Sequence, residues 1–66
     1  MKHYTQGQFT ITFPITDGVP AATVVAMLAQ LKPGAVIDYM AVDPRTPLAG
    51  TRRLIINYRE PADKDN

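Results

Sequence analysis

The side chains that could perform acid–base or nucleophilic chemistry are few in this sequence. There is one histidine, His3, and there is no cysteine or serine. A histidine that acts as a general base or metal ligand needs partners held at fixed geometry, and His3 stands in a polar opening segment without a second histidine or a cysteine. The usual nucleophiles of acyl transfer are missing as well. We therefore expect no catalytic, metal-binding or cofactor-binding residue and predict that the protein is not an enzyme.

The six carboxylates have local structural explanations. Asp17 precedes a predicted helix, where its side chain would accept hydrogen bonds from early helix amides. Asp43 stands before a proline at the start of a turn-rich stretch, another common position for aspartate. Asp38 lies within a predicted strand, and we expect it to face Arg53 or Arg59 across the sheet. None of these aspartates is spaced like a catalytic acid pair or a calcium loop.

The arginines raise a second kind of chemistry, the recognition of nucleic acid. Arg45, Arg52, Arg53 and Arg59 all fall on one predicted hairpin or its loop, and a basic two-stranded ribbon can enter a DNA groove. The formal net charge is only +1, whereas nucleic-acid-binding domains usually carry a clear positive surplus. Nucleic-acid binding is therefore possible but less favoured than contacts with protein.

The elements that must position these residues begin with a strand. The segment 1–7 is polar and predicts a loose lead-in. Apolar and polar residues then alternate, which is typical of a half-buried strand. Pro14 interrupts the amide ladder, so this strand should lie at a sheet edge. The inward set is Phe9, Ile11, Phe13 and Ile15.

A helix should follow. Pro20 suits the first helical turn, and Pro33-Gly34 ends the segment. One apolar stripe recurs at helical spacing, which is typical of a helix packed on a sheet. The stripe is Val24, Met27, Leu28 and Leu31.

Two further strands are predicted over 36–42 and 52–59, joined by a loop over 43–51. The second strand of the chain is expected to face inward with Ile37, Tyr39 and Ala41 and outward with Val36, Asp38, Met40 and Val42. The third strand should face inward with Leu54, Ile56 and Tyr58. Residues 62–66 form a charged tail that we expect to be mobile.

The order strand–helix–strand–strand predicts a single α+β domain over residues 1–66. It would be a three-stranded, mainly antiparallel sheet with one helix packed on one face. The third strand has the densest apolar run, so we place it between the other two. The order first–second–third is the alternative.

Two surfaces of this fold would be unusual. The helix carries no charged residue from 18 to 31, although the outer face of a lone helix normally does. The open sheet face would hold Met40 and Ile55 as apolar anchors, with Arg53 and Arg59 at the rim. Loop residues Arg45 and Leu48 would extend this partner-binding surface.

These surfaces favour a small protein-binding module that acts by occupying a partner surface. Its size and predicted element order are similar to those of small phage-encoded inhibitors of host enzymes, including a phage inhibitor of bacterial RNA polymerase. This resemblance implies a phage or bacterial accessory or inhibitory role, and no residue is carried over with it. The alternatives are a nucleic-acid-binding module and a structural homodimer. Since no apolar run reaches the ~20 residues of a membrane span and no signal peptide is apparent, we expect a cytoplasmic location without membrane contact.

Overall fold

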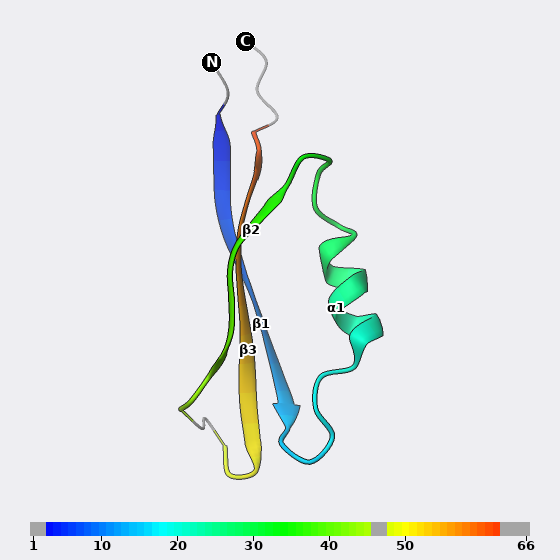
Figure 1. Ribbon diagram of the computed structural model, residues 1–66, viewed down its shortest axis with the longest axis vertical. Coiled ribbons are helices and arrows are strands. Elements are labelled where there is room, and N and C mark those ends of the chain that lie inside the picture. The colour runs from blue at the N-terminus through cyan, green and yellow to red at the C-terminus, as the bar shows by residue number, and fades with distance from the viewer. Residues whose placement is uncertain (1–2, 46–47, 63–66) are drawn as a thin grey trace.

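The fold consists of one helix and one three-stranded sheet. The computed structural model describes residues 3–45 and 48–62. The elements are β1 (Tyr4–Pro14), α1 (Ala21–Leu28), β2 (Val36–Asp43) and β3 (Thr51–Pro61), as Figure 1 shows. The strands are ordered β1-β3-β2, and β3 pairs antiparallel with both neighbours. The predicted α+β class and the predicted central position of the third strand are confirmed.

The pairing of β1 with β3 confirms the predicted inward face of both strands except at Ile15, which lies beyond the end of β1 and is exposed. Phe9 pairs with Ile56, and Ile11 pairs with Leu54. Residues directly opposite each other on paired strands share a face. The burial of β1 alternates along the strand, with the odd-numbered positions from 7 to 13 less exposed than the even-numbered ones. The apolar side chains of β1 and β3 therefore meet on one side of the sheet.

The predicted loose lead-in is wrong over residues 4–7, because they belong to β1. Tyr4 pairs with Pro61, and the amide of Ala62 donates to the carbonyl oxygen of His3 at 2.9 Å. The reason is the length of β3, which continues two residues beyond the predicted end and gives the polar start of β1 a pairing partner. Of the predicted tail, residues 63–66 lie outside the described residues, as do Thr46 and Pro47 of the predicted loop.

The start of α1 also differs from the prediction. Pro20 is the N-cap, and no side chain caps the helix. The carboxylate of Asp17 instead accepts from the hydroxyl of Thr16 at 3.1 Å. The amides of Asp17 and Gly18 donate to the carbonyl of Pro14, and Gly18 has a positive φ of 75°. This turn ends too early for Asp17 to reach the first helical amides.

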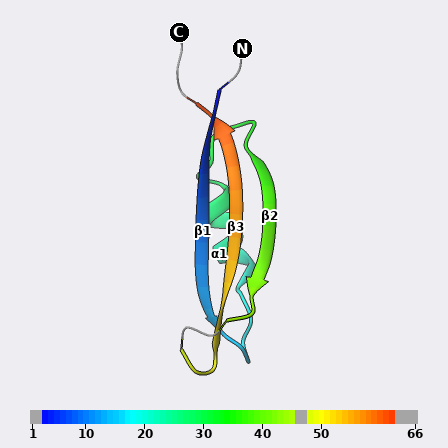
Figure 2. The same ribbon diagram turned by 90° about the vertical axis from the view of Figure 1, so that its left-hand side faces the viewer.

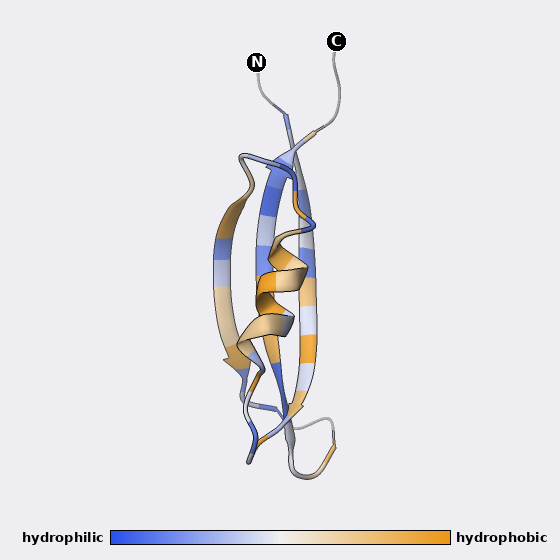
Figure 3. Cartoon of the chain, turned by 90° about the vertical axis from the view of Figure 1, so that its right-hand side faces the viewer, coloured by the Kyte–Doolittle hydropathy of each residue, from blue (hydrophilic) through white to orange (hydrophobic). Residues whose placement is uncertain are grey.

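The helix packs on one face of the sheet, over β3 and toward β1 (Figures 2 and 3). Its predicted apolar stripe is confirmed, because the four stripe residues are the least exposed of the segment from Ala21 to Leu31. They are Val24, Met27 and Leu28 of α1 and also Leu31, which follows the end of a helix that is shorter than predicted. None of the helical residues is fully buried, so the helix adds to a shallow core. Ile56 in the central strand is the one fully buried hydrophobic side chain among the described residues.

A β-bulge in β2 overturns the predicted inner and outer faces of that strand after Asp38, whereas Val36 and Ile37 before it lie on the predicted faces. Ile37 pairs with Tyr58, but the next pairing is Tyr39 with Asn57, so Asp38 is an extra residue. A bulge of one residue reverses the alternation beyond it. Beyond Asp38, Met40 pairs with Ile56. Met40 and Val42 therefore lie on the helix side, while Tyr39 and Ala41 lie on the opposite face.

Candidate protein-binding surface

The helix side of β2 carries an uncovered row of apolar side chains. We call Ile37, Met40 and Val42 the β2 strip. Their exposed fractions are 39 %, 48 % and 46 %, whereas Ile56, the partner of Met40 in the neighbouring strand, is completely buried. Figure 3 shows the helix in front of the sheet, with β2 uncovered at its side. The apolar face of the sheet thus extends beyond the part that the chain covers itself.

The β2 strip is uncovered because the single short helix cannot cover all three strands. An eight-residue helix is about 12 Å long, and it lies along the central strand instead of crossing the sheet. The described residues hold no second helix on this face. The row on β2 is consequently left in solvent, where a surface of this kind typically marks an interaction site.

The backbone of β2 is also available for contact. Among the described residues, this strand pairs with β3 alone, so its other edge presents amide and carbonyl groups without a strand partner. Such an edge can accept a strand from another chain. Exposed apolar side chains and an unpaired backbone edge therefore occur together on one element.

The outward face of α1 adds a second apolar surface on the same side of the molecule. Val25 is 65 % exposed, and its helical neighbours Ala22, Thr23 and Ala26 are exposed as well. The helix has no acidic residue in its first turn and no basic residue in its last turn. The predicted uncharged outer face of the helix is confirmed.

The opposite face of the sheet is mainly polar, contrary to the expected apolar centre. It has a shallow hollow of about 510 Å³. Within it, the side-chain amide of Gln8 donates to the Asn57 oxygen at 2.8 Å. The hollow is lined by Gln6, Gly7, Gln8, Asp38, Tyr39, Asn57 and Tyr58. Of the predicted apolar anchors, only Ile55 faces this side, and it is half-buried.

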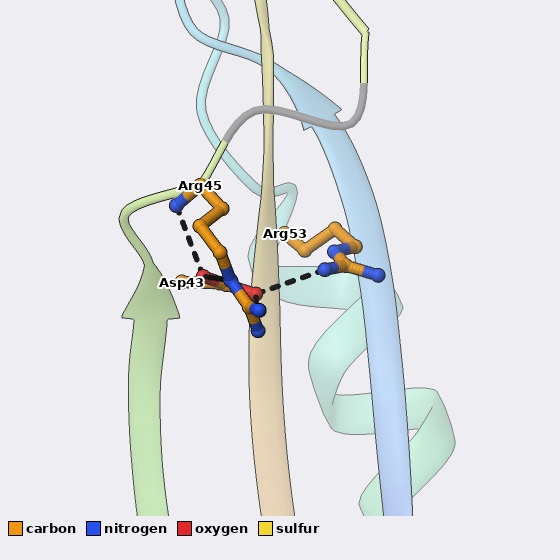
Figure 4. A network of polar contacts seen from close by, with 3 residues as sticks. All are labelled: Asp43, Arg45 and Arg53. Carbon is orange, nitrogen blue, oxygen red and sulfur yellow. Dashed lines mark hydrogen bonds and ion pairs between the residues drawn. The ribbon is translucent and has the colours of Figure 1, made fainter.

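A buried carboxylate joins the ends of β2 and β3. Asp43 is 5 % exposed and accepts hydrogen bonds from two arginines (Figure 4). Nε of Arg45 lies 3.2 Å from Oδ1 of Asp43, and a terminal guanidinium nitrogen of Arg53 lies 2.9 Å from Oδ2. The backbone amide of Arg45 also donates to Oδ1. The side-chain and backbone hydrogen bonds from Arg45, followed by that from Arg53, lower the pKa of Asp43 to about 2.

A second ion pair lies on the polar face at the bulge. Nε of Arg59 donates to both carboxylate oxygens of Asp38, at 3.1 and 2.9 Å. This pair confirms the predicted role of Asp38. The hydrogen bond with Asp38 raises the pKa of Arg59. The guanidinium carbon of Arg59 also lies 5.3 Å from the centre of the Tyr4 ring. The bulge thus directs Asp38 toward an arginine of the central strand.

The structure divides the predicted partner-binding residues among three places. Met40 lies on the helix side of the sheet, so its predicted position on the open face is wrong. Ile55, Arg53 and Arg59 lie on the open face, where both arginines are held by aspartates. Arg45 and Leu48 lie in the connecting loop, and Leu48 is 67 % exposed.

Sequence reasoning missed Ile37 as an exposed partner of Met40, and it placed Val42 beside Met40 but on the wrong face of the sheet. The missing signal was the bulge, which no glycine or proline marks in β2. Val25 was also missed, although the absence of charge on the helix pointed to its face.

Comparison with known proteins adds no functional assignment, because no family model, curated protein or solved structure matches this chain. Among the described residues, no cluster of three or more potential metal ligands occurs. Within the same residues, no helix has the length and apolar character needed to cross a membrane.

Proposed function

We propose that this chain is a small non-enzymatic protein-binding module that occupies a partner surface through the β2 strip and the edge of β2. The observation that supports this proposal most directly is the exposure of Ile37, Met40 and Val42 on a strand with a free edge. Such a module acts sterically, as an accessory or inhibitory protein does. Its expected location is the cytoplasm.

The β2 strip and the edge of β2 would favour binding of a partner in two ways. Apolar side chains that are already aligned on a strand lose little conformational freedom on binding. An added strand would supply main-chain hydrogen bonds, while its side chains would cover the β2 strip. Apolar burial at the centre of a contact surrounded by polar groups is the usual anatomy of a protein interface.

The charge distribution gives less support to the nucleic-acid alternative. Three of the four arginines on the hairpin and its loop, Arg45, Arg53 and Arg59, are bound to aspartates. Phosphate binding would have to compete with these carboxylates. We therefore place protein contact ahead of nucleic-acid contact.

The test compares the full-length chain with two matched variants on an affinity support, using extract of the cells from which the chain comes. Met40→Glu places a charge in the β2 strip, and Ile15→Glu makes the same change in the turn after β1. The two wild-type side chains are similarly exposed, at 48 % and 47 %. We expect specific proteins to bind the wild type and Ile15→Glu but not Met40→Glu, with unchanged far-UV circular dichroism for all three. Equal retention by Met40→Glu would contradict the proposal.

A further inference from the structure

We infer that the partner fitted by β2 is a second copy of this chain, joined by antiparallel pairing of the two β2 edges around Ala41. This inference rests on the proposed function, because it names the occupant of the β2 strip. Two copies would form a continuous six-stranded sheet with both helices on the same side. The register of β2, the charges at its ends and the exposed area of the chain support this pairing.

The bulge restricts the register in which β2 can pair with itself. Beyond Asp38, residues 39–43 form the regular part of the strand. A twofold axis at Ala41 sets Met40 of each copy opposite Val42 of the other. Both of these residues lie on the helix side, so apolar side chains would meet across the junction. Tyr39 would pair with Asp43 on the opposite face. In every pair along the regular segment, the two residues therefore lie on the same face of the joined sheet.

Neighbouring registers are less favourable. An axis between Met40 and Ala41 would pair a helix-side residue with one from the polar face, and it would place Asp38 opposite Asp43. Opposed like charges destabilise a strand pair. An axis at Met40 shortens the regular segment, because it brings the bulge of each copy against Val42 of the other. Among these three registers, the one centred on Ala41 matches the faces over the longest regular segment and opposes no like charges.

The charges at the ends of this junction are also complementary. In the Ala41 register, Asp38 of one copy stands opposite Pro44 of the other, one residue from Arg45. The guanidinium of Arg45 is largely solvent-exposed, with 81 % of its side chain accessible. Asp43, the residue set opposite Tyr39, already has its charge matched by Arg45 and Arg53 within its own chain. No pair of like charges is therefore left face to face.

The chain exposes more surface than its mass predicts for a folded monomer. The chain exposes 4768 Å², whereas surface scaling gives about 4,200 Å² for a folded monomer of this mass. The difference is somewhat below the ~800 Å² that each partner buries in a standard interface. A second copy on β2 would bring the exposed surface closer to that of an ordinary small protein.

The other edge of the sheet is a poorer place for a second copy. The helix-side residues of β1, Phe9 and Ile11 among them, are half-buried by the chain itself. Pro14 at the end of β1 has no amide hydrogen to donate. Pairing through β1 would leave the β2 strip in solvent.

The absence of cysteine from the sequence allows a direct test of the register. Ala41→Cys places two thiols opposite each other across the axis, at a Cα separation that a disulfide can bridge. We expect mild oxidation to convert Ala41→Cys into a covalent dimer. An equimolar mixture of Met40→Cys and Val42→Cys should give a mixed dimer in larger yield than either variant alone. Ala26→Cys, exposed on the helix, is the control and should give little covalent dimer under the same oxidation.

Sedimentation of the chain without cysteine gives the second readout. We expect the wild type and Ile15→Lys to be dimeric at micromolar concentration, and Met40→Lys to be monomeric with unchanged circular dichroism; the wild-type side chains of the two variants are similarly exposed. A monomeric wild type would overturn the inference. The proposed function would survive that result if Met40→Glu still abolished capture of another protein, and it would fail together with the inference if it did not. A dimer that cross-links through Ala26→Cys instead of Ala41→Cys would overturn the β2 junction.

Discussion

Asp43 shows how one side chain can fix the end of a hairpin in a protein with little core. Its carboxylate is buried, yet it keeps its charge because Arg45 and Arg53 donate hydrogen bonds to it from two sides of the β2–β3 connection. Removing one partner of such a group leaves a buried polar atom unsatisfied, which costs more than the hydrogen bond itself contributes. Part of the network is already incomplete, since Nε of Arg53 is buried without a hydrogen-bond partner among the described residues.

The lowered pKa of Asp43 predicts an acid-sensitive fold. Because its pKa is about 2 in the folded chain and 3.8 in the reference state, the ionised group stabilises the fold at pH values above the reference pKa. This stabilisation is lost as the pH falls from about 4 toward 2. We expect Asp43→Asn to melt at a lower temperature than the wild type at neutral pH, and the gap to narrow as the pH approaches 2. Thermal unfolding followed by circular dichroism measures both.

Asp17→Asn is the control for this experiment. Asp17 is exposed, and its side-chain hydrogen bond is with the adjacent Thr16. Its variant should melt close to the wild type at each pH. A gap between wild type and Asp43→Asn that stays constant down to pH 2 would show that the carboxylate charge of Asp43 does not stabilise the fold.

Gly7 is a second residue whose role appears only in the folded chain. It pairs with Tyr58, and a Cβ added at Gly7 would overlap the hydroxyl end of the tyrosine ring. The ring of Tyr58 also packs against Phe9, with 5.0 Å between the ring centroids. The absence of a side chain at Gly7 therefore lets the tyrosine lie across β1.

This close approach predicts that Gly7→Ala is destabilising. Overpacking of this kind typically costs about 1–3 kcal/mol, and urea unfolding of the full chain would measure the loss. The double variant Gly7→Ala/Tyr58→Leu removes the ring that the new methyl group meets. If the clash is the cause, adding Gly7→Ala should cost less in the Tyr58→Leu chain than in the wild type. Equal costs in the two backgrounds would contradict this explanation.

At the scale of elements, the sequence predicted most where the periodicity was long and unbroken. The alternation Phe9, Ile11 and Phe13 identified a strand and its buried face, and the helix stripe identified the packed side of α1. Both signals reflect the burial of one face, which the sheet and the helix satisfy together. The central position of β3 was also predictable, because a strand with partners on both sides is the most buried.

The bulge at Asp38 is where prediction from periodicity failed. A single extra residue exchanges the two faces of every later position in the strand. Because β2 has apolar residues on both faces, such as Met40 and Ala41, its sequence did not show which face is inward. The choice depended on pairing with β3 and on the ion pair from Asp38 to Arg59, which are contacts between residues far apart in sequence. The predicted binding surface was therefore divided between two faces.

The uneven burial of the elements predicts which core substitution matters most. Ile56 is fully buried, whereas Leu28 on the helix is half-buried. Truncation of a buried isoleucine or leucine to alanine costs about 2–5 kcal/mol, and the cost is smaller at positions that are less buried. We expect Ile56→Ala to lower the free energy of unfolding more than Leu28→Ala in parallel urea titrations. An equal or larger effect of Leu28→Ala would mean that the helix contributes more to the core than its exposure indicates.

At the scale of the whole molecule, a short helix on a three-stranded sheet leaves more apolar surface than the chain can cover. Much of the uncovered part lies on the helix side of β2 and on the outer helix face, while the opposite face of the sheet is mainly polar, although Val36 and Tyr39 are exposed there. This asymmetry gives the molecule one side suited to contact with protein. Small domains without disulfides or metal often depend on association for stability, and the uncovered apolar side of this molecule is consistent with that rule.

The distribution of charge over the whole molecule predicts weak binding to nucleic acid. The net charge is +1, and Arg45, Arg53 and Arg59 are held by aspartates, so few cations are available to release counterions from a phosphate backbone. We expect the fluorescence anisotropy of labelled single-stranded and duplex oligonucleotides to change little on titration with the wild type at physiological salt.

Asp38→Asn is the sensitive comparison, because it frees Arg59 and raises the formal charge by one unit. It should increase any low-salt binding, and this increase should disappear as salt is added. Tight binding by the wild type, weakened by Arg45→Ala and Arg52→Ala but unaffected by Met40→Glu, would instead favour a nucleic-acid-binding hairpin.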